Sequence, residues 1–142
     1  MTEAAGNGMA VHEVLHPSHW KRAQGYANGI AAEGRLVVLG GLIGWDGDQV
    51  FQTDDFAGQV AQTLENIVAV LACAGARPEH LVRLTWYVTD KRDYLASLAE
   101  VGAAYRRIIG RHYPAMALVQ VVALVEDRAK VEIEATAVIP QG

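Results

Sequence analysis

The chain has 142 residues, of which 51% are hydrophobic and 20% are charged, a balance typical of a folded domain. A domain of this length buries enough apolar surface to fold without disulfides or a structural metal. Its single cysteine, Cys73, has no partner for an internal disulfide. The formal net charge of −4 lacks the basic surface that binding to a phosphate backbone requires, which argues against nucleic acid as a partner.

The domain organisation follows from composition along the chain. Residues 1–10 are rich in Gly, Ala and Asn and are predicted to form a flexible N-terminal tail, which leaves residues 11–142 as a single domain. The tail has no basic region followed by an apolar stretch, so it does not resemble a secretory signal. The longest apolar runs, residues 36–43 and 119–125, are far shorter than the roughly 20 residues of a membrane helix. These features predict a cytoplasmic protein with no membrane partner.

The first part of the domain predicts short strands. Residues 11–15 form a strand candidate that Pro17 ends. Residues 28–33 and 36–42 are two extended runs, and Gly34 between them can supply the positive φ of a tight turn. We therefore predict a hairpin from these two runs.

An amphipathic helix is predicted next, beginning after residues 53–55, whose side-chain oxygens can cap its first turn, and ending near residue 74. Four apolar residues recur at helical spacing and form one stripe toward a core: Val60, Leu64, Ile67 and Leu71. Three polar residues are predicted to lie away from that stripe: Gln59, Gln62 and Glu65. Gly75 provides the C-terminal cap.

Residues 81–88 predict a strand, because they are rich in β-branched and aromatic side chains. Alternation places its side chains on two faces, with Arg83, Thr85 and Tyr87 on one and Leu84, Trp86 and Val88 on the other. A second helix is predicted to begin at Asp90 or Asp93 and to end at Gly110.

Two further strands are predicted at residues 116–124 and 130–138, and their short connection predicts an antiparallel pair. The element order is therefore βββαβαββ. Two helices of this length can cover one face of a sheet of about six strands, which predicts the α+β class.

The sheet face away from the helices is predicted to mix apolar and polar side chains. The apolar ones are Leu118, Val122 and Leu124, and the polar ones are Gln120, Glu132 and Tyr87. Such a surface is too apolar to remain in water, so we predict an oligomer interface with a candidate ligand site between subunits.

Four segments occur in an order and at a spacing that resemble the RidA/YjgF family of reactive-intermediate deaminases. They are Gly40-Gly41-Leu42-Ile43, Gln62-Thr63-Leu64-Glu65-Asn66, Tyr113-Pro114-Ala115 and Val131-Glu132-Ile133-Glu134-Ala135. The resemblance implies a chorismate-mutase-like fold with a mixed six-stranded sheet and two helices on one face. It also implies a homotrimer whose sheets form an inner barrel, with small-molecule clefts between subunits.

Active members of this family hydrolyse imines and enamines to a carbonyl compound and ammonia without a cofactor, so the resemblance implies no cofactor here. It implies that Glu132 helps to deliver water, that Tyr26 lines the site and that Gly41 is the strand glycine of the site. Further substrate-binding candidates are Ala115, Met116, Gln120 and Tyr87.

The sequence departs from the family pattern at the substrate-binding arginine, where Met116 stands. Gly102 stands in place of a helix asparagine, and the segment 40–42 replaces Ser-Gly-Gln. Methionine lines adaptable apolar sites, so the cleft is predicted to accept a less acidic or an aromatic ligand. Two alternatives stay open: Met116 packs at an interface, or Arg83 reaches the cleft and replaces the missing guanidinium.

Glu132 and Glu134 lie at i and i+2 of one strand face, and burial at an interface would raise the pKa of such an acid toward the range of a general acid or base. The alternative is that one of them pairs with Arg83 or Lys130 and has a structural role. Three histidines at positions 12, 16 and 19 do not predict a metal site, because Pro17 disfavours a helix there.

Two functions are therefore predicted from the sequence. The first is hydrolytic deamination of an imine, an enamine or a related activated substrate other than the standard 2-imino acids. The second is a non-catalytic trimer that binds a small metabolite or acts as a chaperone. Ribonuclease activity, which is also attributed to this family, conflicts with the acidic balance and with the lack of a histidine pair beside a basic residue.

Overall fold

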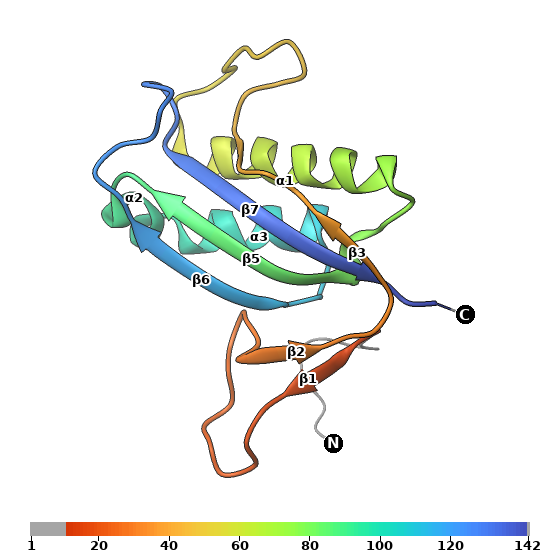
Figure 1. The fold of residues 1–142 in the computed structure, drawn as a ribbon. Helices are drawn as coiled ribbons and strands as arrows, with labels where there is room; N and C mark the ends of the chain where they lie inside the picture. The colour runs from red at the N-terminus through yellow and green to blue at the C-terminus, as the bar shows by residue number, and fades with distance from the viewer. Residues whose placement is uncertain (1–10, 142) are drawn as a thin grey trace.

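The computed structural model describes residues 11–141, so the predicted tail at residues 1–10 lies outside the described residues. A twisted sheet forms the body of the molecule, with helices packed on one of its faces (Figure 1). A separate two-stranded sheet, made of β1 (Glu13–Leu15) and β2 (Gly29–Ala31), lies beyond one end of this body.

The main sheet has five strands. β7 (Val131–Ile139) lies between β3 (Arg35–Val38) and β5 (Leu81–Val88), and β6 (Ala115–Gln120) forms the edge beyond β5. The two-residue strand β4 (Leu42–Ile43) also pairs with β7. β5 and β6 are parallel and the other pairs are antiparallel, so the sheet is mixed.

Two predicted strand pairings are wrong. β2 pairs with β1 and β3 pairs with β7, so the residues around Gly34 join two sheets instead of closing a hairpin. The predicted six-stranded sheet therefore has five strands. β6 and β7 are separated by β5, because residues 121–130 between them are long enough to cross it.

Four helical segments accompany the sheet: α1 (Phe56–Cys73), the 3-10 turn η1 (Pro78–His80), α2 (Lys91–Ala96) and α3 (Leu98–Ile108). The Asp55 side chain accepts a hydrogen bond from the Gly58 amide at 2.8 Å and caps α1, as the sequence predicts. The predicted second helix is broken into α2 and α3, and Asp90 caps its beginning. Gly75 and Gly110 follow the two long helices with positive φ angles of 75° and 95°.

The core lies between α1, α3 and the sheet. All four residues of the predicted α1 stripe have no exposed surface: Val60, Leu64, Ile67 and Leu71. From the sheet, Leu84, Ile133 and Ala135 meet them. By length and composition alone, α1 is long and apolar enough to cross a bilayer, but its buried stripe packs on the sheet as in the core helix of a soluble domain.

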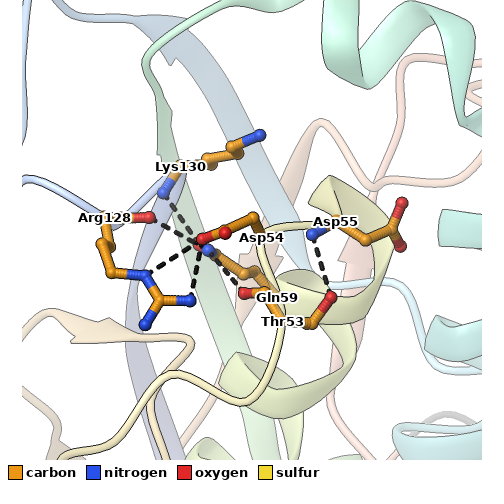
Figure 2. A network of polar contacts seen from close by, with 6 residues as sticks. All are labelled: Thr53, Asp54, Asp55, Gln59, Arg128 and Lys130. Atoms are coloured by element: carbon orange, nitrogen blue, oxygen red, sulfur yellow. Dashed lines mark hydrogen bonds and ion pairs between the residues drawn. The ribbon is translucent and has the colours of Figure 1, made fainter.

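Gln59 departs from its prediction. The sequence predicts that it lies away from the buried stripe, but its side chain is fully buried. Its amide nitrogen donates to the carbonyl oxygens of Thr53 and Arg128 at 3.1 and 3.0 Å, and its oxygen accepts from the Lys130 amide at 2.8 Å (Figure 2). The side chain thus joins the first turn of α1 to the segment that leads into β7. Arg128 also pairs with Asp54 at 2.9 Å, on the exposed side of this junction.

The open face of the sheet also differs from its prediction. Leu118 pairs with Trp86 and packs against the core, so it faces the helices, and Gln120 lies on the same side. Val122 and Leu124 follow the end of β6 and belong to no strand. Along β3 and β6 the open face instead carries Leu36, Val38 and Val119, which are 63%, 68% and 44% exposed.

Candidate functional site

A cavity of about 370 Å³ opens at the β6 edge of the sheet, on the side of the helices. Its walls come from β5, β6, α2, α3 and the loop at residues 24–26. Five aromatic residues line it: Tyr26, Trp86, Tyr94, Tyr105 and Tyr113. Five further apolar side chains complete the apolar wall: Leu98, Val101, Met116, Ala117 and Leu118. A cavity of this size and character is typical of a small-molecule site.

Backbone contacts hold Tyr26 at the mouth of this cavity. Gly25 has a φ of +77°, which turns the chain before the tyrosine. The Ala27 amide then donates to the Pro114 carbonyl at 3.0 Å, and Ala27 forms a parallel bridge with Ala115. The loop is therefore tied to the start of β6, and the structure brings the sequence candidates Tyr26 and Met116 into one cavity, with Ala115 beside them.

Arg106 on α3 is the one charged side chain among the described residues that line the cavity. It lies one helical turn after Gly102, and its Nη1 is 3.2 Å from the point where a Cβ of Gly102 would stand. Sequence reasoning missed this arginine, although the i, i+4 spacing of Gly102 and Arg106 was a signal that could have found it. The cavity therefore carries a positive charge in spite of Met116.

Two aromatic residues on the cavity wall have specific polar environments. The Tyr105 hydroxyl donates to the His112 carbonyl at 2.6 Å, and burial raises the pKa of Tyr105 well above its ordinary value. Tyr105 also stacks on Tyr113 with ring centroids 5.3 Å apart, so it is a neutral, rigid wall. Trp86 differs: within residues 11–141 its indole Nε1 is the one buried side-chain polar atom without a hydrogen-bond partner.

A second group of candidates lies on the open face of the sheet. Glu132 is half-buried, and a Cβ at Gly41 would collide with its carboxylate, so only a glycine leaves room for this placement. Tyr87 pairs with Glu132 in the β5–β7 register, and its hydroxyl donates to Glu134 at 2.8 Å. That hydrogen bond raises the pKa of Tyr87.

The remaining candidates take other positions. The Gln120 side chain accepts a hydrogen bond from the Lys91 amide at 2.8 Å at the beginning of α2 and does not line the cavity. Arg83 pairs with Thr136 and is exposed on the open face, away from Met116 of the same chain. Among the ion pairs of the described residues, none involves Glu132 or Glu134.

The candidate residues thus form two groups on opposite faces of one sheet. The cavity holds Tyr26 and Met116 with Arg106, and the open face holds Gly41 and Glu132 with Tyr87. Met116 pairs with Leu84 on the core side, whereas Glu132 pairs with Tyr87 on the open side. A single chain therefore does not bring the two groups together.

The sequence and the fold both have clear relatives. A family model described as endoribonuclease L-PSP matches residues 18–139. The chain is 34% identical over 108 residues to a 2-iminobutanoate/2-iminopropanoate deaminase of Salmonella typhimurium, covering 74% of this chain and 80% of that protein. It is also 34% identical over 129 residues to protein DfrA of Myxococcus xanthus, covering 89% of this chain and 95% of that protein.

Solved structures of the Rid family share the fold. A Rid-family protein of unknown function from Yersinia pestis superposes with a TM-score of 0.81 at 28% identity, covering 92% of this chain and 100% of that chain. RidA from an Antarctic Psychrobacter superposes with a TM-score of 0.64 at 30% identity, covering 80% of this chain and 88% of that chain.

Proposed function

Since the chain belongs to the RidA/YjgF family, we propose that it hydrolyses the C=N bond of an imine, or of an enamine after tautomerisation, in a cleft between subunits. The observation that carries this proposal is the placement of two candidate groups on opposite faces of one sheet. The cavity provides a wall for a substrate, and the half-buried Glu132 provides a proton acceptor. A second copy of the chain that lays its open face against the cavity mouth would complete the site.

The proposed homotrimer supplies this arrangement, with the open faces of the sheets forming an inner barrel. The exposed Leu36, Val38 and Val119 are the apolar side chains that such a barrel would bury. Each cleft would then take its cavity from one subunit and Glu132 from the next.

The reaction needs one water and one group that accepts and returns a proton. Glu132 takes a proton from water while the water oxygen bonds to the imine carbon. The C=N π electron pair moves to nitrogen, which then takes that proton from the Glu132 carboxyl. The Glu132 carboxylate then takes the hydroxyl proton of the carbinolamine and returns it to nitrogen, as the C–N bond breaks, the C=O bond forms and ammonia leaves. Imine and water thus give a carbonyl compound and ammonia, with no change of redox state.

The test is hydrolysis of imines generated in the assay by an amino-acid oxidase, with wild type compared with Glu132→Gln. Loss of general-base catalysis is expected to lower the rate by about 10²–10⁴-fold. Glu134→Gln on the same strand face is the matched control, and it is expected to keep most of the activity because the Glu134 carboxylate is exposed and paired with Tyr87. Equal rates for the two variants would reject the role of Glu132.

The second candidate function is a non-catalytic trimer that binds a small metabolite. Met116 favours it, because this residue lines the cavity and cannot hold a carboxylate by an ion pair. In that case wild type shows no hydrolysis of any imine tested, and Glu132→Gln keeps ligand binding. A gain of activity in Met116→Arg would then indicate an intact scaffold that no longer uses 2-imino acids.

RNA cleavage is not proposed, although the description of the family model names an endoribonuclease. The net charge is −4, and Arg106 is the single cation among the described cavity-lining residues. A site that holds an RNA backbone needs several cations along its length.

A further inference from the structure

We propose that Arg106 provides the guanidinium that Met116 lacks, so that the cavity selects substrates with a carboxylate and an aromatic body. This inference rests on the proposed function of the same cleft and specifies its substrate class. It moves the anion-binding group from strand β6 to helix α3, on the other side of the cavity.

Arg106 is available for a ligand. It lines the cavity, and none of the ion pairs within residues 11–141 involves it. No carboxylate is present among the described lining residues, so nothing on the wall competes with a bound anion. An arginine beside an aromatic, partly enclosed surface forms strong charge-assisted hydrogen bonds with a carboxylate.

Gly102 explains why the guanidinium can lie along the cavity wall. A side chain at this position would begin 3.2 Å from Arg106 Nη1, which is closer than such contacts normally are. Glycine weakens a helix interior relative to alanine, so its presence inside α3 has a stability cost. The room that Gly102 leaves for the Arg106 side chain accounts for a glycine at this position in spite of that cost.

Trp86 packs into the same wall. The residue is 4% exposed and lines the cavity, and its Nε1 atom is itself buried, with no acceptor among residues 11–141. A ligand ring in the cavity would lie against the indole, so the indole reports whether the cavity is occupied. Arg106 is the one charged group of the described wall, beside apolar side chains, Gln24 and tyrosines.

The size and lining of the cavity indicate an aromatic substrate body. Its volume is about 370 Å³, and a dry cavity of about 150 Å³ is enough to bind benzene. A phenyl ring with a short carboxylate-bearing chain therefore fits, whereas a two- to four-carbon imino acid leaves much of the apolar wall uncovered. The five aromatic lining residues can stack on such a ring.

Calorimetric binding of 3-phenylpropionate tests this inference without any turnover. The neutral 3-phenylpropanamide keeps the ring and removes the charge, and it is expected to bind at least about tenfold more weakly. Arg106→Gln is expected to weaken the binding of 3-phenylpropionate by a similar factor and to leave the binding of 3-phenylpropanamide nearly unchanged. Arg107→Gln is the matched control, since Arg107 is the neighbouring residue on α3 and is exposed like Arg106, but does not line the cavity.

An NMR titration gives an independent readout. The indole N–H resonance of Trp86, assigned by its loss in Trp86→Phe, is expected to shift when 3-phenylpropionate binds to the wild type. This measurement uses the wild-type chain, so it tests the inference even if Arg106→Gln fails to fold. A Trp86 resonance that does not move at saturating ligand contradicts the inference, as do equal affinities of the Arg106 and Arg107 variants.

The experiments distinguish the proposed hydrolysis by Glu132 from the proposed carboxylate binding by Arg106. If the phenylpropionate affinity depends on Arg106 but no imine is hydrolysed, the proposed function is wrong and the ligand class stands. If imine hydrolysis depends on Glu132 but neither binding nor KM responds to Arg106→Gln, the catalytic proposal stands and the inference about Arg106 is wrong.

Discussion

A buried side-chain amide stabilises a fold when all its polar atoms are paired, and Gln59 meets this condition. Its two ends bond to two carbonyl groups and one amide of the backbone, all from segments without regular structure (Figure 2). These three backbone groups belong to no helix or strand. The Gln59 carboxamide supplies the hydrogen-bond partners that regular secondary structure would otherwise provide.

Replacing Gln59 with leucine keeps the volume but removes all three hydrogen bonds. Each of these part-buried backbone groups costs up to about 1–3 kcal/mol when left unpaired, so we expect Gln59→Leu to lower the free energy of unfolding by about 2 kcal/mol or more. Urea denaturation followed by circular dichroism measures this change. Glu65→Ala, on the exposed side of α1, is the control and is expected to stay within about 0.5 kcal/mol of wild type. A similar small effect for Gln59→Leu would show that water replaces the carboxamide.

Single residues were the least predictable from sequence. Helical periodicity correctly identified the apolar stripe of α1. It treats every glutamine as polar, so it could not detect that the Gln59 side chain is buried and bonds to the Arg128 carbonyl and the Lys130 amide. Arg106 was missed for a related reason. The i, i+4 spacing places it beside Gly102, but only the fold shows that this part of the helix surface lines the cavity.

At the scale of elements, Gly34 controls how the chain passes from the small sheet to the large one. Its φ is +148°, and a Cβ there would collide with the backbone carbonyl oxygen of Ile139. Arg35 pairs with Ile139 at the same point, so the collision falls at the beginning of the β3–β7 ladder. A backbone atom within a paired strand cannot move aside cheaply.

Gly34→Ala is therefore expected to destabilise the protein by at least about 2 kcal/mol, because it combines a disfavoured φ with a backbone collision. A lower midpoint of thermal unfolding measures the effect. Gly47→Ala is the matched control, since no atom lies within contact of a Cβ at that loop position and its φ is not positive. Equal midpoints for the two variants would show that β3 shifts to accommodate the methyl group.

Local elements were predicted better than their partners. The strand at residues 81–88 and the helix ending before Gly75 match their predictions, because alternation, capping residues and a glycine specify them locally. Pairings depend on contacts far apart in sequence, and the short loops suggested neighbours that are not adjacent. Thus β5 lies between β6 and β7, and the residues after Gly34 pair with β7 instead of β2.

At the scale of the whole molecule, the proposed assembly depends on the open face of the sheet. Glutamate at Val38, which is 68% exposed at the end of β3, would introduce a charge into the proposed barrel. We expect light scattering to give the wild type a mass of about three times 15.3 kDa and Val38→Glu a smaller one.

Val70→Glu is the control for this measurement. Val70 is also exposed, at 41%, but it lies on α1 on the helix side of the sheet. This variant is expected to keep the mass of the wild type. A monomeric wild type, or equal masses for both variants, would contradict assembly through the open face. The sequence predicted a mixed open face, and Glu132 and Tyr87 lie there, but none of the three predicted apolar residues does: Leu118 lies on the opposite side with Gln120, and Val122 and Leu124 follow β6.

The separation of the cavity from Glu132 has a genetic consequence. In the proposed ring each chain lends its cavity to one cleft and its glutamate to another, so two defective chains can repair each other. Co-assembly of Arg106→Gln with Glu132→Gln in equal amounts leaves about a quarter of the clefts with both groups intact. Complementation between two alleles, each impaired alone, is therefore the signature of a catalyst whose active site lies at the boundary between chains.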